Sequence, residues 1–245
     1  MASMNIKRRF TPADSMVDLV KEDFNILPIL SRFSLPLGFG NKTIAEVCME
    51  QGIDTDIFLL IVNFIFSGKI ISEKPSGMAA TGIVDFLHNS HTYFLTYKFP
   101  HIRANLINAL DCHHSDINPA IIRFFDDYVE EVKKHFEYEE TTLFPYIRQL
   151  AEGHRSDYNI EVFRRHHDEI GEKLSELKNI ILRYYSTSRP NLMYDALVDI
   201  FNCEDDLDIH NDIENYILVP MIASLEHIRD TSEPYNKPIS RRKKS

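Results

Sequence analysis

The chain has 245 residues, 44% hydrophobic and 26% charged, as expected of a folded chain with one larger or two smaller domains. Its formal net charge of −10 argues against nucleic acid as the main partner, because phosphate binding needs a basic face. The most apolar run, Ile57 to Phe66, is interrupted by Asn63 and is shorter than the ~20 residues that a membrane span needs. With no signal-peptide pattern and no C-x-x-C pair, we expect a cytoplasmic protein that does not act at a membrane.

The first part of the chain reads as a small helical module, residues 13–72. Apolar residues recur at helical spacing up to a Pro/Gly-rich break at residues 35–40. A second helix is expected over residues 43–51. Asp54 or Thr55 would cap a third helix that runs to Phe66. The polar segment that follows, with Pro75 and Gly77, is a plausible linker.

Beyond the linker, residues 81–230 are expected to form an all-α, up-down-up-down four-helix bundle. Short connections between long helical patterns are typical of antiparallel neighbours. Pro100 and Pro145 should kink these helices or end them early. The polar residues 231–245 are expected to be a disordered basic tail. The approximate helix limits are 82–110, 118–148, 157–186 and 190–227.

An internal repeat carries the chemical signal. The pattern H-x-x-x-E-x-x-x-L-[FV]-P begins at His135 and again at His210, an offset of 75 residues. Residues four apart lie on one face of a helix, so each copy directs a histidine and a carboxylate, Glu139 or Glu214, inward together. A lone pair of this kind is usually an exposed surface pair, but two copies on one template are hard to obtain by chance.

Each copy is preceded by a further histidine at nearly the same distance. His91 lies 44 residues before His135, and His167 lies 43 residues before His210. Two helical hairpins packed against each other would therefore bring four histidines and two carboxylates to one level of the core. If both carboxylates bridge, each of two metal ions receives two oxygens and two imidazoles. Iron or manganese would then keep open positions for a small ligand, and zinc also accepts these donors.

A further ligand has several candidates. His88 stands one turn before His91, and the adjacent pair His113 and His114 follows the first long helix. His114 precedes Ser-Asp in a loop and could fold back onto one metal ion. Each of these histidines can equally be a solvated or locally bonded side chain.

At this point the chain resembles the hemerythrin-like, or HHE cation-binding, family. Within it, the likeness is to bacterial di-iron proteins associated with repair of iron–sulfur centres under nitric oxide and oxidative stress. The residues that carry the resemblance are Ser90-His91-Thr92-Tyr93-Phe94 before Phe99-Pro100, His135 to Glu140 before Leu143-Phe144-Pro145, His167-Asp168-Glu169, and His210 with Glu214.

The resemblance implies a site of two iron ions, bridged by oxide and carboxylate. Its ligands would be His91, His135, Glu139, His167, His210 and Glu214, with His114 in the remaining position. Residues 31–48 also follow the outline of the short helical domain that precedes the bundle in the repair proteins. That domain normally carries adjacent cysteines in its turn, and here Gly38 and Phe39 occupy those places.

The leading functional expectation is a non-haem di-iron protein. It would bind nitric oxide or dioxygen in the stress response, with iron–sulfur proteins as partners if it repairs their centres. The first alternative is a sensor of oxygen, nitric oxide or redox state that signals through a partner. The second is oxygen or iron storage. Enzymatic turnover and the oligomeric state are not defined by these patterns.

Overall fold

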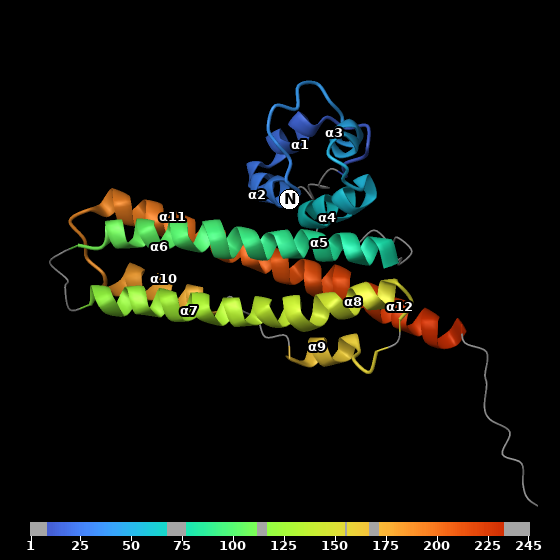
Figure 1. Cartoon of the computed structure of the whole chain (residues 1–245). Helices are drawn as coiled ribbons and strands as arrows, with labels where there is room; N and C mark the ends of the chain where they lie inside the picture. Colours follow the sequence, from blue (N-terminus) through green and yellow to red (C-terminus); the bar gives the residue numbers. More distant parts are fainter. Residues whose placement is uncertain (1–8, 68–76, 112–116, 155, 167–171, 233–245) are drawn as a thin grey trace, which may run out of the picture.

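The computed structural model describes residues 9–67, 77–111, 117–154, 156–166 and 172–232 (Figure 1). Within these ranges the regular structure is helical, apart from one isolated bridge between Ser15 and Thr43. The all-α prediction is therefore confirmed. None of the described helices is long and apolar enough to cross a membrane.

The N-terminal helices lie close to their predicted positions. Thr43 caps the helix Ile44–Glu50 through a capping box. Its hydroxyl accepts from the Glu46 N–H at 3.2 Å, and the Glu46 carboxylate accepts from the Thr43 N–H at 2.8 Å. Asn63 interrupts the apolar run because it bonds both backbone groups of Phe10. The helices are α1 (Met16–Glu22), α2 (Leu27–Arg32), α3 (Ile44–Glu50) and α4 (Thr55–Ser67), with a short 3₁₀ turn at Phe24–Ile26.

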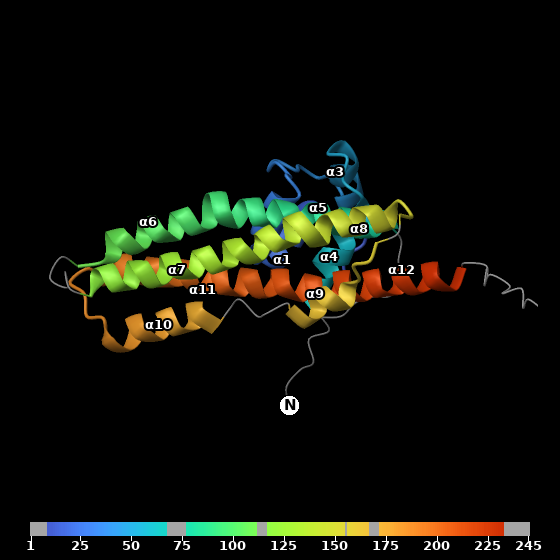
Figure 2. The same cartoon turned by 60° about the horizontal axis from the view of Figure 1, so that its bottom comes forward.

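The rest of the described chain forms long helical rods that lie lengthwise beside one another (Figures 1 and 2). Residues 72–76 of the expected linker and 233–245 of the expected tail lie outside the described residues. The long rods are α5 (Gly77–Tyr93), η2 (Phe94–Lys98) and α6 (Phe99–Ala109); α7 (Asn118–Tyr138), η4 (Glu139–Leu143) and α8 (Phe144–Ala151); and α11 (Pro190–Ile213), η5 (Glu214–Leu218) and α12 (Val219–Ser232). Two shorter helices pack against them: α9 (Ile160–His166) contacts α12, and α10 (Glu172–Tyr184) contacts α7 and α11.

Three of these rods contain a five-residue π-helical turn, and a proline follows each turn by two residues. In η4, the Phe144 N–H donates to the Glu139 carbonyl, five residues back rather than four. This wider turn relieves the clash that proline makes with the carbonyl four residues before it. The expected early end at Pro100 or Pro145 is therefore wrong, since helix continues to Ala109 and Ala151.

The N-terminal helices pack directly on α5 and α11 (Figure 1). The Phe33 ring lies 4.9 Å from the Phe86 ring on α5. Helices α4 and α5 approach closely at Gly82, where an added Cβ would lie 2.2 Å from Cδ1 of Ile57. One apolar cluster runs from the N-terminal helices into the near half of the bundle, and a second fills its far half.

Candidate metal centre

Five predicted site residues converge in the core between the two apolar clusters. His91, Glu139, His210 and Glu214 are buried, and each offers a ligand atom within 4.8 Å of the others. Nε2 of His91 lies 3.0 Å from Glu139 Oε2, and Nε2 of His210 lies 3.1 Å from Glu214 Oε1. His135 joins them, with Nε2 at 2.9 Å from Glu139 Oε1 and its side chain 15% exposed.

The π-helical turns explain how the backbone presents these groups. Glu139 and Glu214 are each the first residue of such a turn, and their histidine partners stand in the α-helical turn before it. The repeated Leu-[Phe/Val]-Pro sequence therefore encodes the wide turn that follows each carboxylate. Isolated π turns of this kind occur frequently at functional sites.

The cluster fits a metal ion. Nε2 of His91 and both ring nitrogens of His210 are buried, and none makes a hydrogen bond of normal geometry to the described residues. The side chains of Glu139 and Glu214 are 0% exposed beside them. Concentrating carboxylates in a core is costly without a compensating cation. Imidazole and carboxylate donors suit iron, manganese and zinc.

Aromatic rings enclose the histidines. The Phe136 ring stacks on His91 at 4.0 Å, and the Phe144 ring stacks on it at 5.3 Å. The Phe94 ring meets His210 edge to face at 6.1 Å. These rings restrict both imidazoles and keep the site dry.

Glu140 is a site residue that the repeat does not reveal. Its Oε1 lies 2.7 Å from Nδ1 of His91, on the side of the ring away from Glu139. The described His88, considered above as a ligand, instead lies at the surface with Nδ1 2.9 Å from Glu140 and a side chain 54% exposed. The adjacent glutamates Glu139 and Glu140 are visible in the sequence. Helix packing decides which of them contacts the outer side of the His91 ring.

These contacts set the charge of the metal-free site. Burial lowers the pKa of His91, but the Glu139 and Glu140 carboxylates outweigh it and raise the pKa to about 9. Partial burial raises the pKa of Glu140, but the hydrogen bonds to His91 and His88 prevail and leave it below its ordinary value. In the metal-free site, a protonated His91 therefore lies between two carboxylates.

Two predicted ligands are not placed. His167 and His114 lie outside the described residues, as does the alternative His113. Their roles stay predictions.

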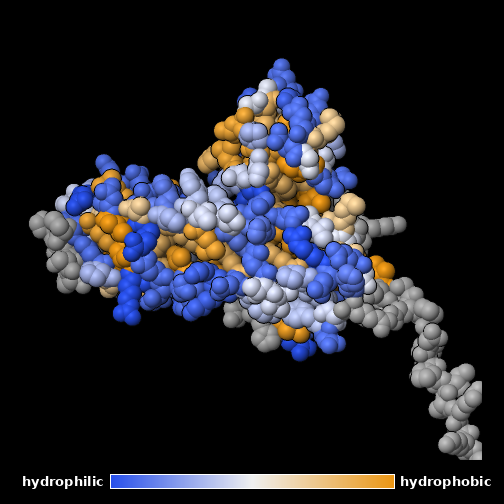
Figure 3. All heavy atoms as spheres, in the orientation of Figure 1, coloured by the Kyte–Doolittle hydropathy of each residue, from blue (hydrophilic) through white to orange (hydrophobic). Residues whose placement is uncertain are grey.

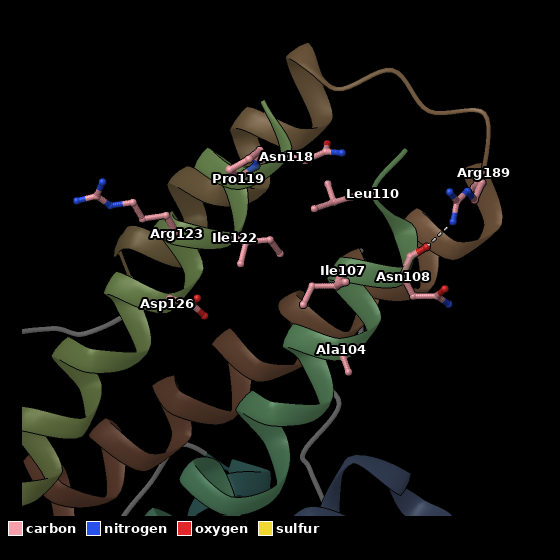
Figure 4. Close-up of a pocket in the computed structure, with 10 residues that line it drawn as sticks. All are labelled: Ala104, Ile107, Asn108, Leu110, Asn118, Pro119, Ile122, Arg123, Asp126 and Arg189. Carbon is pink, nitrogen blue, oxygen red and sulfur yellow. Dashed lines mark hydrogen bonds between the residues drawn. The ribbon is translucent and has the colours of Figure 1, made fainter. Parts of the chain in front are cut away.

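A cavity elsewhere in the molecule is separate from this centre. It is an open surface cavity of about 760 Å³ between the ends of α6 and α7, lined by Ile107, Leu110, Ile122 and Arg123, among others (Figure 4). An apolar area appears at the α6–α7 end of the rods in the space-filling view (Figure 3). None of the five clustered residues lines this cavity, so the cavity is distinct from the His/Glu site.

Comparison with known proteins agrees with this geometry. The family model for the hemerythrin HHE cation binding domain matches residues 82–222. The iron-sulfur cluster repair protein YtfE of Salmonella paratyphi B is 23% identical over 186 residues, covering 74% of this chain and 83% of the relative. YtfE of Escherichia coli O81 is 24% identical over 189 residues with the same coverage. The match spans every member of the buried His/Glu cluster, and the chain belongs to the hemerythrin HHE cation-binding domain family.

Proposed function

We propose that the protein holds two iron ions in this cluster and binds a small gaseous ligand there, nitric oxide or dioxygen, under nitrosative or oxidative stress. The buried convergence of His91, His135, Glu139, His210 and Glu214 supports the proposal. His167 and His114 would complete the ligand set. Oxide together with the two carboxylates would bridge the ions, within an up-down-up-down bundle over residues 81–230.

The chain's own groups would shape the site. Bound iron would supply open coordination positions and a change of oxidation state. Glu139 and Glu214 offer two oxygens each and can span two ions. Glu140 would fix the ring orientation of His91, as carboxylates behind ligating histidines commonly do. Phe94 and Phe136 would exclude water from the ligand side chains.

We extend the proposal to repair of iron–sulfur centres in the cytoplasm, with iron–sulfur proteins as partners. The relatives named as iron-sulfur cluster repair proteins match 74% of the chain. We also propose that residues 13–72 act as a small helical module before the bundle.

One observation favours a sensor as the second candidate. The turn at Gly38 and Phe39 has no thiol, and Phe39 is buried in the core. Cys48 is also fully buried, and burial raises the pKa of its thiol to about 11. The N-terminal module thus lacks a reactive thiol among its described residues, which suits ligand-dependent signalling better than transfer of iron or nitrosyl groups through cysteine.

The test is metal analysis of protein purified without oxygen. We expect about two irons per chain, since a site of this donor set holds two ions. The double variant His135→Ala/His210→Ala should lose them. A matched control, His101→Ala/His154→Ala, removes two exposed histidines and should keep them. Full iron content in the first variant would overturn the assignment. Catalytic loss of nitric oxide would favour repair or reduction, and binding once per site would favour a sensor.

A further inference from the structure

Arg32, the last residue of α2, is buried against the bundle with 1% of its surface exposed. Its Nη2 donates to Asp206 Oδ2 on α11 at 2.5 Å. The Asn89 side chain on α5 donates to the Arg32 carbonyl at 2.8 Å. Arginine is almost never fully buried without a partner, and this ion pair forms a polar junction between the N-terminal helices and the rods.

The Arg32–Asp206 pair is connected to the candidate metal centre through one aromatic ring and one helical turn. The guanidinium carbon is 4.8 Å from the centre of the Phe94 ring, and that same ring touches His210. Asp206 stands four residues before His210, so it lies one turn away on the same face of α11. A single aromatic ring and a single helical turn separate this buried charge pair from a predicted ligand.

Stability alone does not account for the pair. Nε and Nη1 of Arg32 are buried, and neither has a hydrogen-bond partner among the described residues. Leaving buried donors without partners is costly, and a buried ion pair is often no better than an apolar replacement of similar volume. Charges in a dry core do act strongly on their neighbours, because solvent screens them little.

We propose that Arg32 and Asp206 form a charge pair through which the N-terminal module sets the electrostatic potential at the metal centre. Arg32 is then a positioning residue that acts through Phe94 and α11. This inference rests on the proposed function, since it requires a metal that changes oxidation state. The cation at Arg32 disfavours the oxidised, more positive centre, and the anion at Asp206 favours it.

The two charges therefore predict opposite effects on the reduction midpoint potential. Arg32→Gln leaves the Asp206 carboxylate unbalanced, stabilises the oxidised centre and should lower the potential. Asp206→Asn leaves the guanidinium unbalanced and should raise it. The double variant Arg32→Gln/Asp206→Asn should return close to the unaltered protein. Arg32→Lys, which keeps the charge, should also stay close to it.

The experiment is a spectroelectrochemical titration of the full, iron-loaded chain at one pH and ionic strength. Lys42→Gln is the matched control, because Lys42 forms an exposed ion pair with Glu50 within the same module. Its potential should not change. Equal shifts in the same direction for Arg32→Gln and Asp206→Asn, or no shift in either, would overturn the inference and leave a purely structural pair.

Two further outcomes are distinguishable. If the unaltered chain binds no redox-active metal, the proposed function fails before the inference is reached. If Arg32→Gln does not fold, as judged by circular dichroism, Asp206→Asn and Arg32→Lys still decide the matter. A lowered or unchanged potential in Asp206→Asn would contradict the charge-pair role.

Discussion

The Nδ1 atom of His91 lies 2.7 Å from Oε1 of Glu140, while Nε2 on the other side of the ring lies 3.0 Å from Glu139. The imidazole is thus held between an inner and an outer carboxylate. His88 binds the outer carboxylate from the surface. Outer partners of this kind fix the tautomer and orientation of a ligating histidine and strengthen it as a donor.

Replacing Glu140 by glutamine should weaken metal binding. Loss of an outer carboxylate typically lowers metal affinity by about 10- to 100-fold. The effect should appear in a competitive titration of the metal-free protein with cobalt(II) against a chelator. Glu137→Gln is the control, since Glu137 is exposed near the end of α7, just before η4. Equal affinities for Glu140→Gln and the unaltered protein would show that Glu140 does not support His91.

The clustering of His135 with Glu139 and of His210 with Glu214 could be predicted from the sequence because it depends on helical spacing alone. The i, i+4 relation of His135 to Glu139 is a property of any helix, and its recurrence at His210 indicates a common site. The role of Glu140 was not accessible in this way. It depends on how α5 packs against η4, which brings side chains 49 positions apart into contact.

In the fold as well, local features could be predicted from the sequence and long-range contacts could not. Helix positions in the N-terminal module follow from capping residues such as Thr43 and from apolar periodicity. The buried contact of Arg32 with Asp206 joins residues 174 positions apart, and no local sequence pattern predicts it. The early end expected at Pro100 and Pro145 does not occur, because the wider π turn before each proline accommodates it.

Metal binding should release a proton from His91. Its pKa is raised to about 9 in the metal-free protein, so the ring is protonated at neutral pH. A ligating imidazole must be neutral, so the metal displaces that proton below about pH 9 and displaces none from this ring above it. Apparent affinity should therefore rise with pH up to that value.

Calorimetric titration with zinc in buffers of different ionisation enthalpy measures this release. The observed enthalpy should depend on the buffer at pH 7 and more weakly at pH 10. His91→Gln, with a side chain that does not titrate, should lower the number of protons released at pH 7. A count unchanged by that substitution would exclude His91 as the source.

Asn63→Leu should destabilise the N-terminal module although it makes α4 more apolar. Asn63 accepts from the Phe10 N–H at 2.8 Å and donates to the Phe10 carbonyl at 3.0 Å, both buried. Loss of buried hydrogen bonds through one partner costs about 1–3 kcal/mol. The urea midpoint should fall accordingly, while Asn25→Ala, at an exposed amide, should leave it unchanged. A higher midpoint for Asn63→Leu would show that apolar burial outweighs these bonds.

Cys48 should be inert in the folded protein. It is 0% exposed, and its pKa is raised to about 11 by burial, so only about one thiol in ten thousand is ionised at pH 7. In a Cys112→Ser background, iodoacetamide should leave Cys48 and Cys203 unmodified under native conditions. The same chain in denaturant should react fully at both positions.

The burial of Cys48 predicts that its thiol takes no part in function. Cys48→Ser should keep the iron content and the nitric oxide response of the unaltered protein, because a buried, protonated thiol neither binds iron nor accepts a nitrosyl group. Native-state alkylation of Cys48 at the rate of the unfolded chain would contradict the burial. Loss of the response in Cys48→Ser with iron retained would instead restore a thiol-dependent role to the N-terminal module, and would count against a sensor that works without cysteine chemistry.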